Sequence, residues 1–468
     1  MAQDTTAATT AGPDGGDGRR RGEVDMLHGP LARKLVAFAL PLAATSIVQQ
    51  LFTMADGSVL GRFVGSEALA AVGATTPIVA LYLDFLVGTS VGANVEVAMR
   101  IGRGDRGGIT RSVRTAMTLS VAIGVILAVV GMAASRPLLR VTGAPGEVLD
   151  AASAYLATYC AGLPFVGVYN FGSAVMRSKG DSRTPLLVLA IACAANVALD
   201  LLLAVLLDLG VTGAALGTSL SNALAAGLTL RCLARQPGPF RLRLGGVVDG
   251  ASLRVILRMG LPAGLQTAIF AVSNILIQWA INGFGPDAIA ACAATWNYES
   301  FTYFMVSAFA SAAVTFIGQN YTAGAYDRCR RVFWLCMAFG CGFAAALGIL
   351  FASLSGVFLA AFTTSAGVLA FAIPRMWLVQ ALEFLPFLFE VPAGAMRGMG
   401  VSLLPTVITV VGSCLLRIVW VCTVFAARPT FLTLIAVYPI SWVLTGAAML
   451  VALAWVRRAT LARQPRRA

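Results

Sequence analysis

Long apolar runs separated by short polar segments dominate the sequence from residue 34 to residue 456. Each run is longer than the ~20 residues that an α-helix needs to cross the hydrocarbon core of a bilayer. Backbone groups inside lipid must find their hydrogen-bond partners within the chain, and a helix provides them. The sequence therefore predicts an all-α integral membrane protein with twelve transmembrane helices, at residues 34–60, 68–98, 112–134, 146–176, 184–207, 211–232, 252–283, 287–317, 329–353, 365–397, 402–426 and 430–456.

The distribution of Lys and Arg between the predicted spans indicates the orientation of the chain. If the N-terminus lies in the cytoplasm, 28 of the 34 basic residues fall in cytoplasmic tails and loops. The four on the opposite side are Arg62, Arg136, Arg140 and Arg428. Because cytoplasmic loops of membrane proteins carry an excess of Lys and Arg, we expect a multi-pass protein of the plasma (inner) membrane with both termini cytoplasmic.

A set of residues recurs at a spacing of about 220 positions. It comprises Leu40-Pro41, Met176-Arg177, Gly180 and Pro185 in the first half, and Leu261-Pro262, Met396-Arg397, Gly400 and Pro405 in the second. We therefore predict two homologous six-helix bundles. Because six is an even number, both halves enter the membrane in the same direction, and a pseudo-twofold axis along the membrane normal relates them. The substrate path is then expected between the two bundles.

The repeat also predicts the boundaries of the units. The two six-helix bundles are expected at residues 31–233 and 251–457, joined by a cytoplasmic linker at 234–250. Residues 1–30 are rich in Gly, Asp, Thr and Arg and lack apolar runs, so we predict a disordered cytoplasmic tail there. Residues 458–468 are predicted to form a second cytoplasmic tail.

Composition excludes several classes of function. The chain has 468 residues, 58% of them hydrophobic and 12% charged, and its net charge is +13. The basic residues are dispersed between apolar spans, so nucleic-acid binding is not expected. His28 is the only histidine, and the nine cysteines show no metal-binding spacing. The chain lacks the residues that metal-dependent catalysis and Ser-His catalysis require. We therefore predict that the protein is not an enzyme and has no cofactor.

The fifth predicted span carries two polar side chains in its middle, Asn196 and Asp200. Their spacing places them on one helix face, and a carboxylate at this depth costs at least ~2.5 kcal/mol to insert. Asp56 in the first span, Asn170 in the fourth and Thr218 in the sixth offer further oxygen atoms. Together these residues could form a cage for one small cation or a proton relay. Alternatively, they only hydrogen-bond neighbouring helices.

The second half lacks this polar group, because Leu416 and Trp420 occupy the positions equivalent to Asn196 and Asp200. It carries other acids among aromatic residues. Those expected to line a substrate cavity are Glu299, Glu390, Trp296, Tyr298 and Phe389. Acidic and aromatic side chains together suit a lipophilic organic cation, through charge and cation–π attraction.

Two alternatives remain open for these second-half residues. The aromatic side chains could face lipid or packing partners instead of a cavity. The two basic residues inside the spans, Arg375 and Arg417, could neutralise Glu383 or Glu390 as ion pairs.

Four segments, in order and at matching spans, resemble the multidrug and toxic compound extrusion (MATE) family. They are ADGSVLGRFVGSEALAAVG at residues 55–73, SAVMRSKGDSRTP at 173–185, AANVALD at 194–200 and FIGQNYTAGAYDRCRR at 316–331. The resemblance covers residues 34–456, and within the family the chain is most similar to the DinF-like bacterial branch.

This resemblance implies a secondary antiporter that exports small organic cations through the bilayer by alternating access, in exchange for Na⁺ or H⁺. It also implies a set of cation-coupling residues, which map onto Asp56, Asn196, Asp200, Thr218 and Asn170. The first four would bind Na⁺ if the protein is sodium-coupled. We further expect the transporter to be a monomer.

The larger superfamily also allows an alternative function. This is a flippase or exporter of a lipid-linked or anionic metabolite precursor. Such a protein would need a strongly cationic cavity for phosphate groups, and the predicted spans contain only Arg375 and Arg417.

Overall fold

The computed structural model describes residues 23–142, 146–243, 245–360 and 362–462, and over these residues it contains helices and turns but no strand. The first half comprises α1 (Leu31–Val59), α2 (Ser66–Gly102), α3 (Arg106–Val141), α4 (Gly146–Ala161), α5 (Leu163–Lys179), α6 (Arg183–Asp200) and α7 (Gly210–Ala234). The second half comprises α8 (Gly250–Asn282), α9 (Pro286–Thr322), α10 (Tyr326–Ser353), α11 (Ser355–Ala360), α12 (Ala366–Leu378), α13 (Phe387–Gly398), α14 (Leu403–Thr409), α15 (Leu416–Trp420), α16 (Phe431–Ile435) and α17 (Val437–Ala462). Short π-helical segments at Leu60–Val64, Leu201–Leu206, Val410–Leu415 and Val421–Phe425 interrupt or extend these helices.

The described helices account for the predicted spans. Ten of them are long and apolar enough to cross a membrane, and the bent pair α4 and α5 supplies an eleventh span. The remaining predicted span corresponds to α7, whose 25 residues extend about 37 Å at 1.5 Å per residue. The predicted all-α membrane fold is therefore confirmed.

The span predicted at residues 146–176 is not a straight helix. It bends by 45° between α4 and α5. Pro164 lies in the first turn of α5 and cannot donate a backbone hydrogen bond to the preceding turn. A proline at this position explains the bend, which the length of the apolar run could not reveal.

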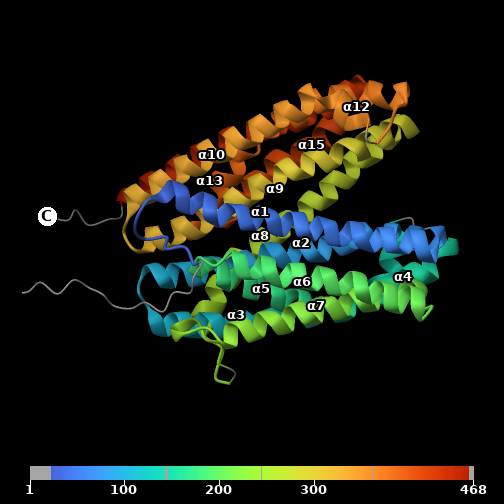
Figure 1. The fold of residues 1–468 in the computed structure, drawn as a ribbon. Helices are drawn as coiled ribbons and strands as arrows, with labels where there is room; N and C mark the ends of the chain where they lie inside the picture. The colour runs from blue at the N-terminus through green and yellow to red at the C-terminus, as the bar shows by residue number, and fades with distance from the viewer. Residues whose placement is uncertain (1–22, 143–145, 244, 361, 463–468) are drawn as a thin grey trace, which may run out of the picture.

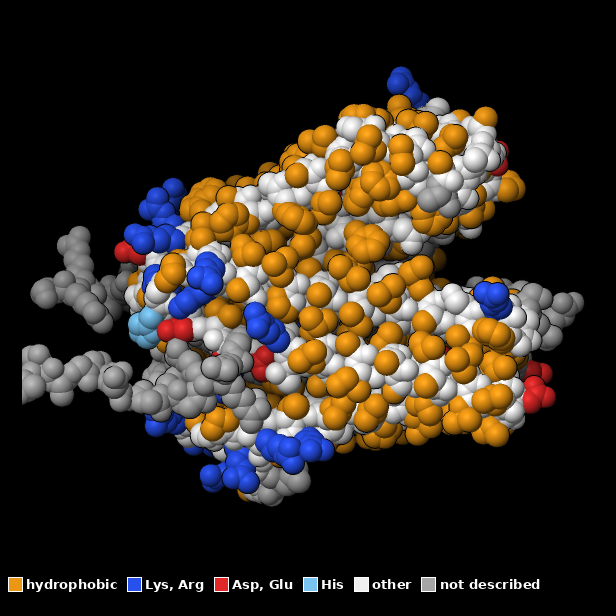
Figure 2. Space-filling view, in the orientation of Figure 1, with side chains coloured by type: hydrophobic (Ala, Val, Ile, Leu, Met, Phe, Trp, Pro, Cys, Tyr) orange, Lys and Arg blue, Asp and Glu red, His pale blue; other side chains and the backbone are white. Residues whose placement is uncertain are grey.

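The helices form two lobes that separate toward one end of the molecule (Figure 1). The lobes lie close together at the end where α1 begins and α17 ends, and a cleft opens between them at the other end, as the space-filling view shows (Figure 2). Lys and Arg side chains gather at the closed end (Figure 2). We refer to this closed end, which includes the start of α10 and the end of α17, as the basic end.

The two lobes meet where α2 of the first half crosses α8 of the second. Glycines allow this crossing to be close: a Cβ atom at Gly92 would collide with the backbone of Ile256, and one at Gly260 with the backbone of Thr89. Small residues at such crossings allow van der Waals packing of two helix backbones in lipid. The contact between α2 and α8 therefore holds the two halves together beside the cleft.

Residues 23–30 bridge the lobes at the basic end, in contrast to the predicted disordered tail at residues 1–30, of which residues 1–22 lie outside the described part. Lys179 of α5 donates to Glu23 at 2.7 Å. From the second half, Asn320 of α9 and Arg328 of α10 donate to the Met26 carbonyl, at 3.0 and 3.2 Å. The Met26 side chain is fully buried. This apolar anchor and these polar contacts, which composition alone did not indicate, hold the segment in place.

Candidate functional site

A buried polar cluster lies in the first lobe, where α1, α6 and α7 pack together. Asp56 comes from α1, Asn196 and Asp200 from α6, and Thr218 from α7. All four side chains are buried, and those of Asn196 and Asp200 have no exposed surface. The structure therefore brings together four of the five residues expected to couple a cation, which we call the coupling cluster.

Hydrogen bonds connect the coupling cluster across three helices. The Asn196 side-chain amide donates to Asp200 Oδ1 at 3.3 Å and lies 3.5 Å from Thr218 Oγ1. The Thr218 hydroxyl lies 3.2 Å from Asp56 Oδ2 and 3.1 Å from the Ala214 carbonyl. The two carboxyl groups of Asp56 and Asp200 lie close enough to interact directly. One hydroxyl and one amide thus link two carboxyl groups that repel each other when both are charged.

With both carboxyl groups ionised, three oxygen atoms of the coupling cluster accept no hydrogen bond from any described residue. They are Asp56 Oδ1, Asn196 Oδ1 and Asp200 Oδ2, and all three are buried. A buried polar atom without a partner costs about 1–3 kcal/mol, and more when it carries charge. Two carboxylate oxygens and one amide oxygen are the kind of ligands that a hard monovalent cation binds, and the carboxyl groups can equally take up a proton. The residues present therefore fit Na⁺ or H⁺.

Glycines bring α7 close to the cluster. A Cβ atom at Gly217 would collide with Asp200 Oδ1, and one at Gly213 would approach the Leu203 carbonyl to 2.7 Å. Thr218 follows Gly217 directly, so the close approach also places its hydroxyl against α6. The spacing of Gly213 and Gly217 on one helix face is the small-residue pattern that supports close helix packing in membranes.

Two tyrosines of α4 border the cluster and were not predicted. Tyr155 lies near both Asp56 and Asp200, and Tyr159 lies near Asp56. Both are buried, and their rings stack with centroids 6.4 Å apart. The signal in the sequence was their spacing of four residues, which places both on one helix face. Only the packing of α4 against α7 shows that this face is turned toward the carboxyl groups.

Asn170, the fifth predicted coupling residue, lies on α5 and is half-buried. Its side-chain amide donates to the Val166 carbonyl of its own helix at 2.9 Å. The described hydrogen bonds therefore do not connect Asn170 to the coupling cluster, and its role in cation coupling stays a prediction.

In the second half, Glu299 is not a free acid. It forms a buried, bidentate ion pair with Arg375 of α12, with N–O distances of 2.8 and 2.9 Å. Arg375 also packs over the ring of Tyr438. We expected Arg375 to be available for Glu383 or Glu390, but the geometry of the bundle places it opposite Glu299. This neutralisation leaves little of the charge that Glu299 was expected to offer a substrate.

The three aromatic residues expected beside these acids lie in separate environments. Trp296 is 52% exposed on the surface of α9. Tyr298 packs against Phe351, Phe358 and Phe362 and donates to the Phe358 carbonyl at 2.8 Å. Phe389 is buried in the core of the second lobe. The described structure does not gather them around one cavity, so packing, the alternative considered from the sequence, accounts for Tyr298 and Phe389.

Glu390 of α13 lies in a different environment from Glu299. Tyr303 of α9 is 38% exposed. It lies within electrostatic range of Glu390, Glu383 and Arg397 from the second half and of Asp84 from α2 of the first half. Acids from both lobes, together with Arg397, therefore surround one partly exposed tyrosine, which places Glu390 with residues that had not been assigned to the cavity.

Two further buried arginines belong to the second lobe. Arg417 donates to Asn274 at 3.0 Å and packs over the rings of Phe270 and Tyr438. Arg397 was expected in a cytoplasmic segment, but it is buried and donates to Gln266 at 2.8 Å. In both arginines the Nε atom has no partner among the described residues. The last turn of α13 packs inside the bundle, which the length of its apolar run did not show.

Comparison with known proteins agrees with this architecture. The MatE family model matches the chain twice, at residues 41–202 and 262–423. The matches begin at Pro41 and Pro262, which form one of the residue pairs of the predicted repeat. Two matches of the same model support the division into homologous halves.

The chain is similar to two known bacterial proteins over two thirds of its length or more. The probable multidrug resistance protein YoeA of Bacillus subtilis (strain 168) is 26% identical over 394 residues, which cover 81% of this chain and 83% of YoeA. An FAD transporter of Shewanella oneidensis is 26% identical over 322 residues, which cover 67% of this chain and 70% of that protein.

The fold is shared with solved structures. A multidrug resistance MATE family transporter in an outward-facing conformation superposes with a TM-score of 0.84 at 23% identity, covering 94% of this chain and 98% of that one. The membrane-spanning helices of the two described lobes, the duplicated family match and the relatives lead to one conclusion. The chain belongs to the MatE family of multidrug and toxic compound extrusion transporters, and it is a transporter rather than an enzyme.

Proposed function

We propose that this transporter exports organic cations in exchange for Na⁺ or H⁺, and that the coupling cluster is where the inward-moving cation binds. The observation that carries the proposal is the group of three buried oxygen atoms that find no hydrogen-bond donor in the described part of the chain, Asp56 Oδ1, Asn196 Oδ1 and Asp200 Oδ2. A structural role for these residues would favour satisfied hydrogen bonds. A cation-binding role requires oxygen atoms that are free to accept a cation.

The proposed orientation places the basic end in the cytoplasm. Lys and Arg side chains concentrate there, as the positive-inside rule requires. The cleft, which opens at the opposite end (Figure 2), then faces outward across the plasma (inner) membrane. In this state the first lobe can take up a cation from outside while the basic end is closed.

Neutralisation of charge provides the proposed coupling step. Two nearby carboxylates in a low-dielectric interior repel each other, and a cation or proton between Asp56 and Asp200 removes that repulsion. The three helices α1, α6 and α7 can then pack more closely around the cluster. We propose that this rearrangement weakens substrate binding in the cleft, so that uptake of the cation and release of the substrate alternate.

The substrate class follows from charge between the lobes. Asp84 and Glu390 come from opposite lobes and both lie near Tyr303, where Glu383 adds a third acid and Arg397 a single basic group. Acids beside a partly exposed aromatic ring attract a cation with an apolar body. We propose that one copy of the chain suffices for transport, because both sets of residues belong to a single chain.

A second candidate function is export of an anionic metabolite. Arg397 and Arg417 are buried in the second lobe, and the Nε atom of each has no partner within the described ranges. A guanidinium group in this state can bind a carboxylate or phosphate. The similarity to an FAD transporter of Shewanella oneidensis is consistent with this candidate.

Transport in vesicles tests the proposed function. Purified protein is reconstituted into liposomes loaded with a fluorescent organic cation, and an inward Na⁺ or pH gradient is imposed separately. We expect efflux with one of the two gradients, which names the coupling ion. Efflux of an anionic dye but not of the cation would favour the second candidate, and no gradient-dependent efflux of either dye would contradict the proposal.

A further inference from the structure

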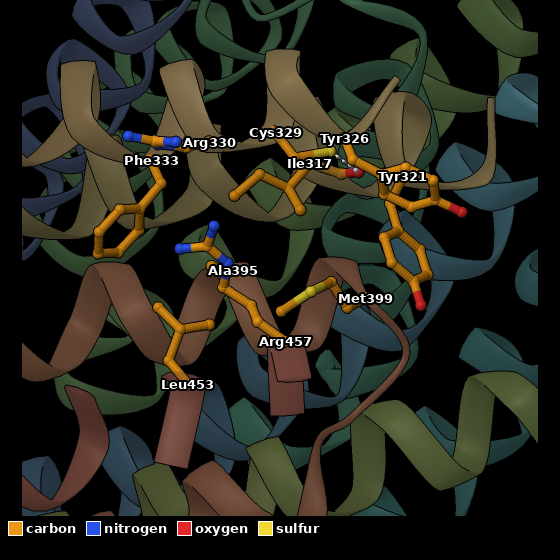
Figure 3. A pocket seen from close by; sticks show the side chains of 10 residues that line it. All are labelled: Ile317, Tyr321, Tyr326, Cys329, Arg330, Phe333, Ala395, Met399, Leu453 and Arg457. Carbon is orange, nitrogen blue, oxygen red and sulfur yellow. Dashed lines mark hydrogen bonds between the residues drawn. The ribbon is translucent and has the colours of Figure 1, made fainter. Parts of the chain in front are cut away.

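A pocket of about 70 Å³ opens at the basic end of the second lobe (Figure 3). It lies where α9, α10, α13 and α17 end or begin, away from the coupling cluster of the first lobe. Its lining residues are Ile317, Tyr321, Tyr326, Cys329, Arg330, Phe333, Ala395, Met399, Leu453 and Arg457. This volume holds several water molecules or one phosphate group. We call it the α10–α17 pocket.

Two arginines give the α10–α17 pocket its charge. Figure 3 shows the guanidinium groups of Arg330 and Arg457 at the same end of the pocket, beside Phe333 and Leu453. None of the ten lining residues is acidic. Two guanidinium groups in one pocket repel each other when no carboxylate lines it. An anion bound between them would attract both and offset this repulsion. Their planar donors suit the oxygens of a phosphate group.

The rest of the pocket is apolar. Ile317, Phe333 and Leu453 are buried hydrophobic residues, and Met399 packs against the same core. A free inorganic anion would gain nothing from these side chains. A molecule that carries a phosphate next to a hydrocarbon chain would contact both parts of the lining.

Aromatic residues indicate the depth of the pocket in the membrane. Trp334 on α10 is 57% exposed and Trp455 on α17 is 65% exposed, and each lies within a few residues of a pocket arginine. Exposed tryptophans are enriched at the boundary between the hydrocarbon core and the headgroups. Basic pockets between helices at this level can bind anionic lipid headgroups.

We propose that the α10–α17 pocket binds one anionic phospholipid, with its headgroup phosphate between Arg330 and Arg457 and the start of an acyl chain along Phe333 and Leu453. Under the proposed orientation this lipid belongs to the inner leaflet. The two arginines repel organic cations, so the pocket is not an entry point for the proposed substrate. Because the lipid contacts helices on both sides of the pocket, its binding stabilises their packing at the basic end.

Lipid binding to the purified full-length protein tests this inference. Native mass spectrometry and thermal unfolding in detergent are measured with phosphatidylglycerol, with phosphatidylcholine of the same acyl chains, and with inorganic phosphate. The test variant is Arg330→Gln with Arg457→Gln. The matched control is Arg331→Gln with Arg458→Gln, which removes the same charge from neighbouring exposed positions outside the pocket lining.

We expect phosphatidylglycerol to bind the wild type and the control equally, and to bind the test variant roughly 30-fold more weakly. Equal binding to all three proteins would overturn the proposal, as would equal binding of phosphatidylcholine. If inorganic phosphate stabilised the wild-type protein against thermal unfolding as much as phosphatidylglycerol does, the pocket would be a site for free anions and the proposal would be wrong. Because these measurements do not use transport, they can fail while gradient-driven efflux succeeds.

Discussion

At the scale of single residues, the coupling cluster depends on a glycine as much as on its acids. Gly217 leaves room for the Asp200 carboxyl group, because a Cβ atom at this position would collide with Oδ1. The carboxyl group has little freedom to move away, since Asp200 is fully buried. The position of α7 relative to α6 therefore sets the geometry of the proposed cation site.

We predict that Gly217→Ala strongly reduces efflux, because the added methyl group displaces Asp200 or separates α7 from α6. Overpacking of this kind costs about 1–3 kcal/mol. The control is Gly227→Ala on the same helix, where an added Cβ atom meets nothing within 4 Å. Drug resistance of cells and the melting temperature of the purified protein check both variants. Wild-type resistance in Gly217→Ala would contradict the proposed role of this contact.

The polar residues of the cluster are evident from the sequence, whereas their surroundings are not. Asp56, Asn196, Asp200 and Thr218 were predicted because polar side chains are costly in apolar spans. Tyr155 was not, because an amphipathic aromatic residue in a span has no such cost and its neighbours depend on tertiary packing.

In the second lobe, the sequence does not predict which charged residues contact one another. The sequence revealed buried acids and arginines, but which arginine opposes which acid depends on the rotation of each helix about its axis. The pairing of Glu299 with Arg375 and the burial of Arg397 could therefore not be derived from spacing within single helices.

At the scale of elements, comparison of the two homologous halves shows which features both halves share and which occur in one half only. A π-helical segment follows Asp200 directly at Leu201–Leu206, and another follows Trp420, its equivalent in the second half, at Val421–Phe425. The irregular backbone thus recurs in both halves, whereas the acid occurs in one. The local unwinding belongs to the fold, and Asp200 was not needed to produce it.

The ion pair between α9 and α12 is predicted to be structural. Glu299→Gln should lower the free energy of unfolding by about 3–5 kcal/mol, because it leaves the Arg375 charge buried without an opposing carboxylate. The double variant Glu299→Met with Arg375→Met should recover most of this loss, since it removes both charges. Thermal unfolding measures both.

A surface ion pair provides the control for this prediction. Asp150 pairs with Arg136 at 2.8 Å, but its side chain is 81% exposed. Asp150→Asn should leave the melting temperature unchanged, because exposed pairs contribute little. If Asp150→Asn lowered the melting temperature as much as Glu299→Gln, the claim that burial makes the Glu299–Arg375 pair important for stability would be wrong.

At the scale of the whole molecule, the two lobes are joined at the basic end and separated at the other (Figure 1). The sequence predicted twelve spans and two homologous halves, because length, charge and repetition are local or periodic signals. It could not predict which end is closed. That depends on the balance of contacts between the lobes, and one such contact comes from residues 23–30, which the sequence had placed in a disordered tail.

We predict that residues 23–30 stabilise the closed basic end, because Glu23 contacts the first lobe while the Met26 carbonyl accepts hydrogen bonds from the second. Spin labels are placed at positions 106 and 331 in a cysteine-free protein. Deletion of residues 1–30 should broaden the distribution of distances between the two labels and shift it to longer values. Deletion of residues 1–22, which keeps these contacts, should leave the distance unchanged. Identical distances in both deletion variants would contradict this role.

The coupling of cation entry to export through Asp56 and Asp200 is tested most directly in proteoliposomes. Gradient-driven efflux of an organic cation is compared in wild type, Asp200→Asn and Asp208→Asn. Asp208 is an exposed acid with φ of 52°, a conformation that Asn also tolerates, so it serves as the matched control. We predict that Asp208→Asn behaves as wild type and that Asp200→Asn loses gradient-driven efflux while it remains folded in the membrane. Full gradient-driven efflux by Asp200→Asn would contradict the account.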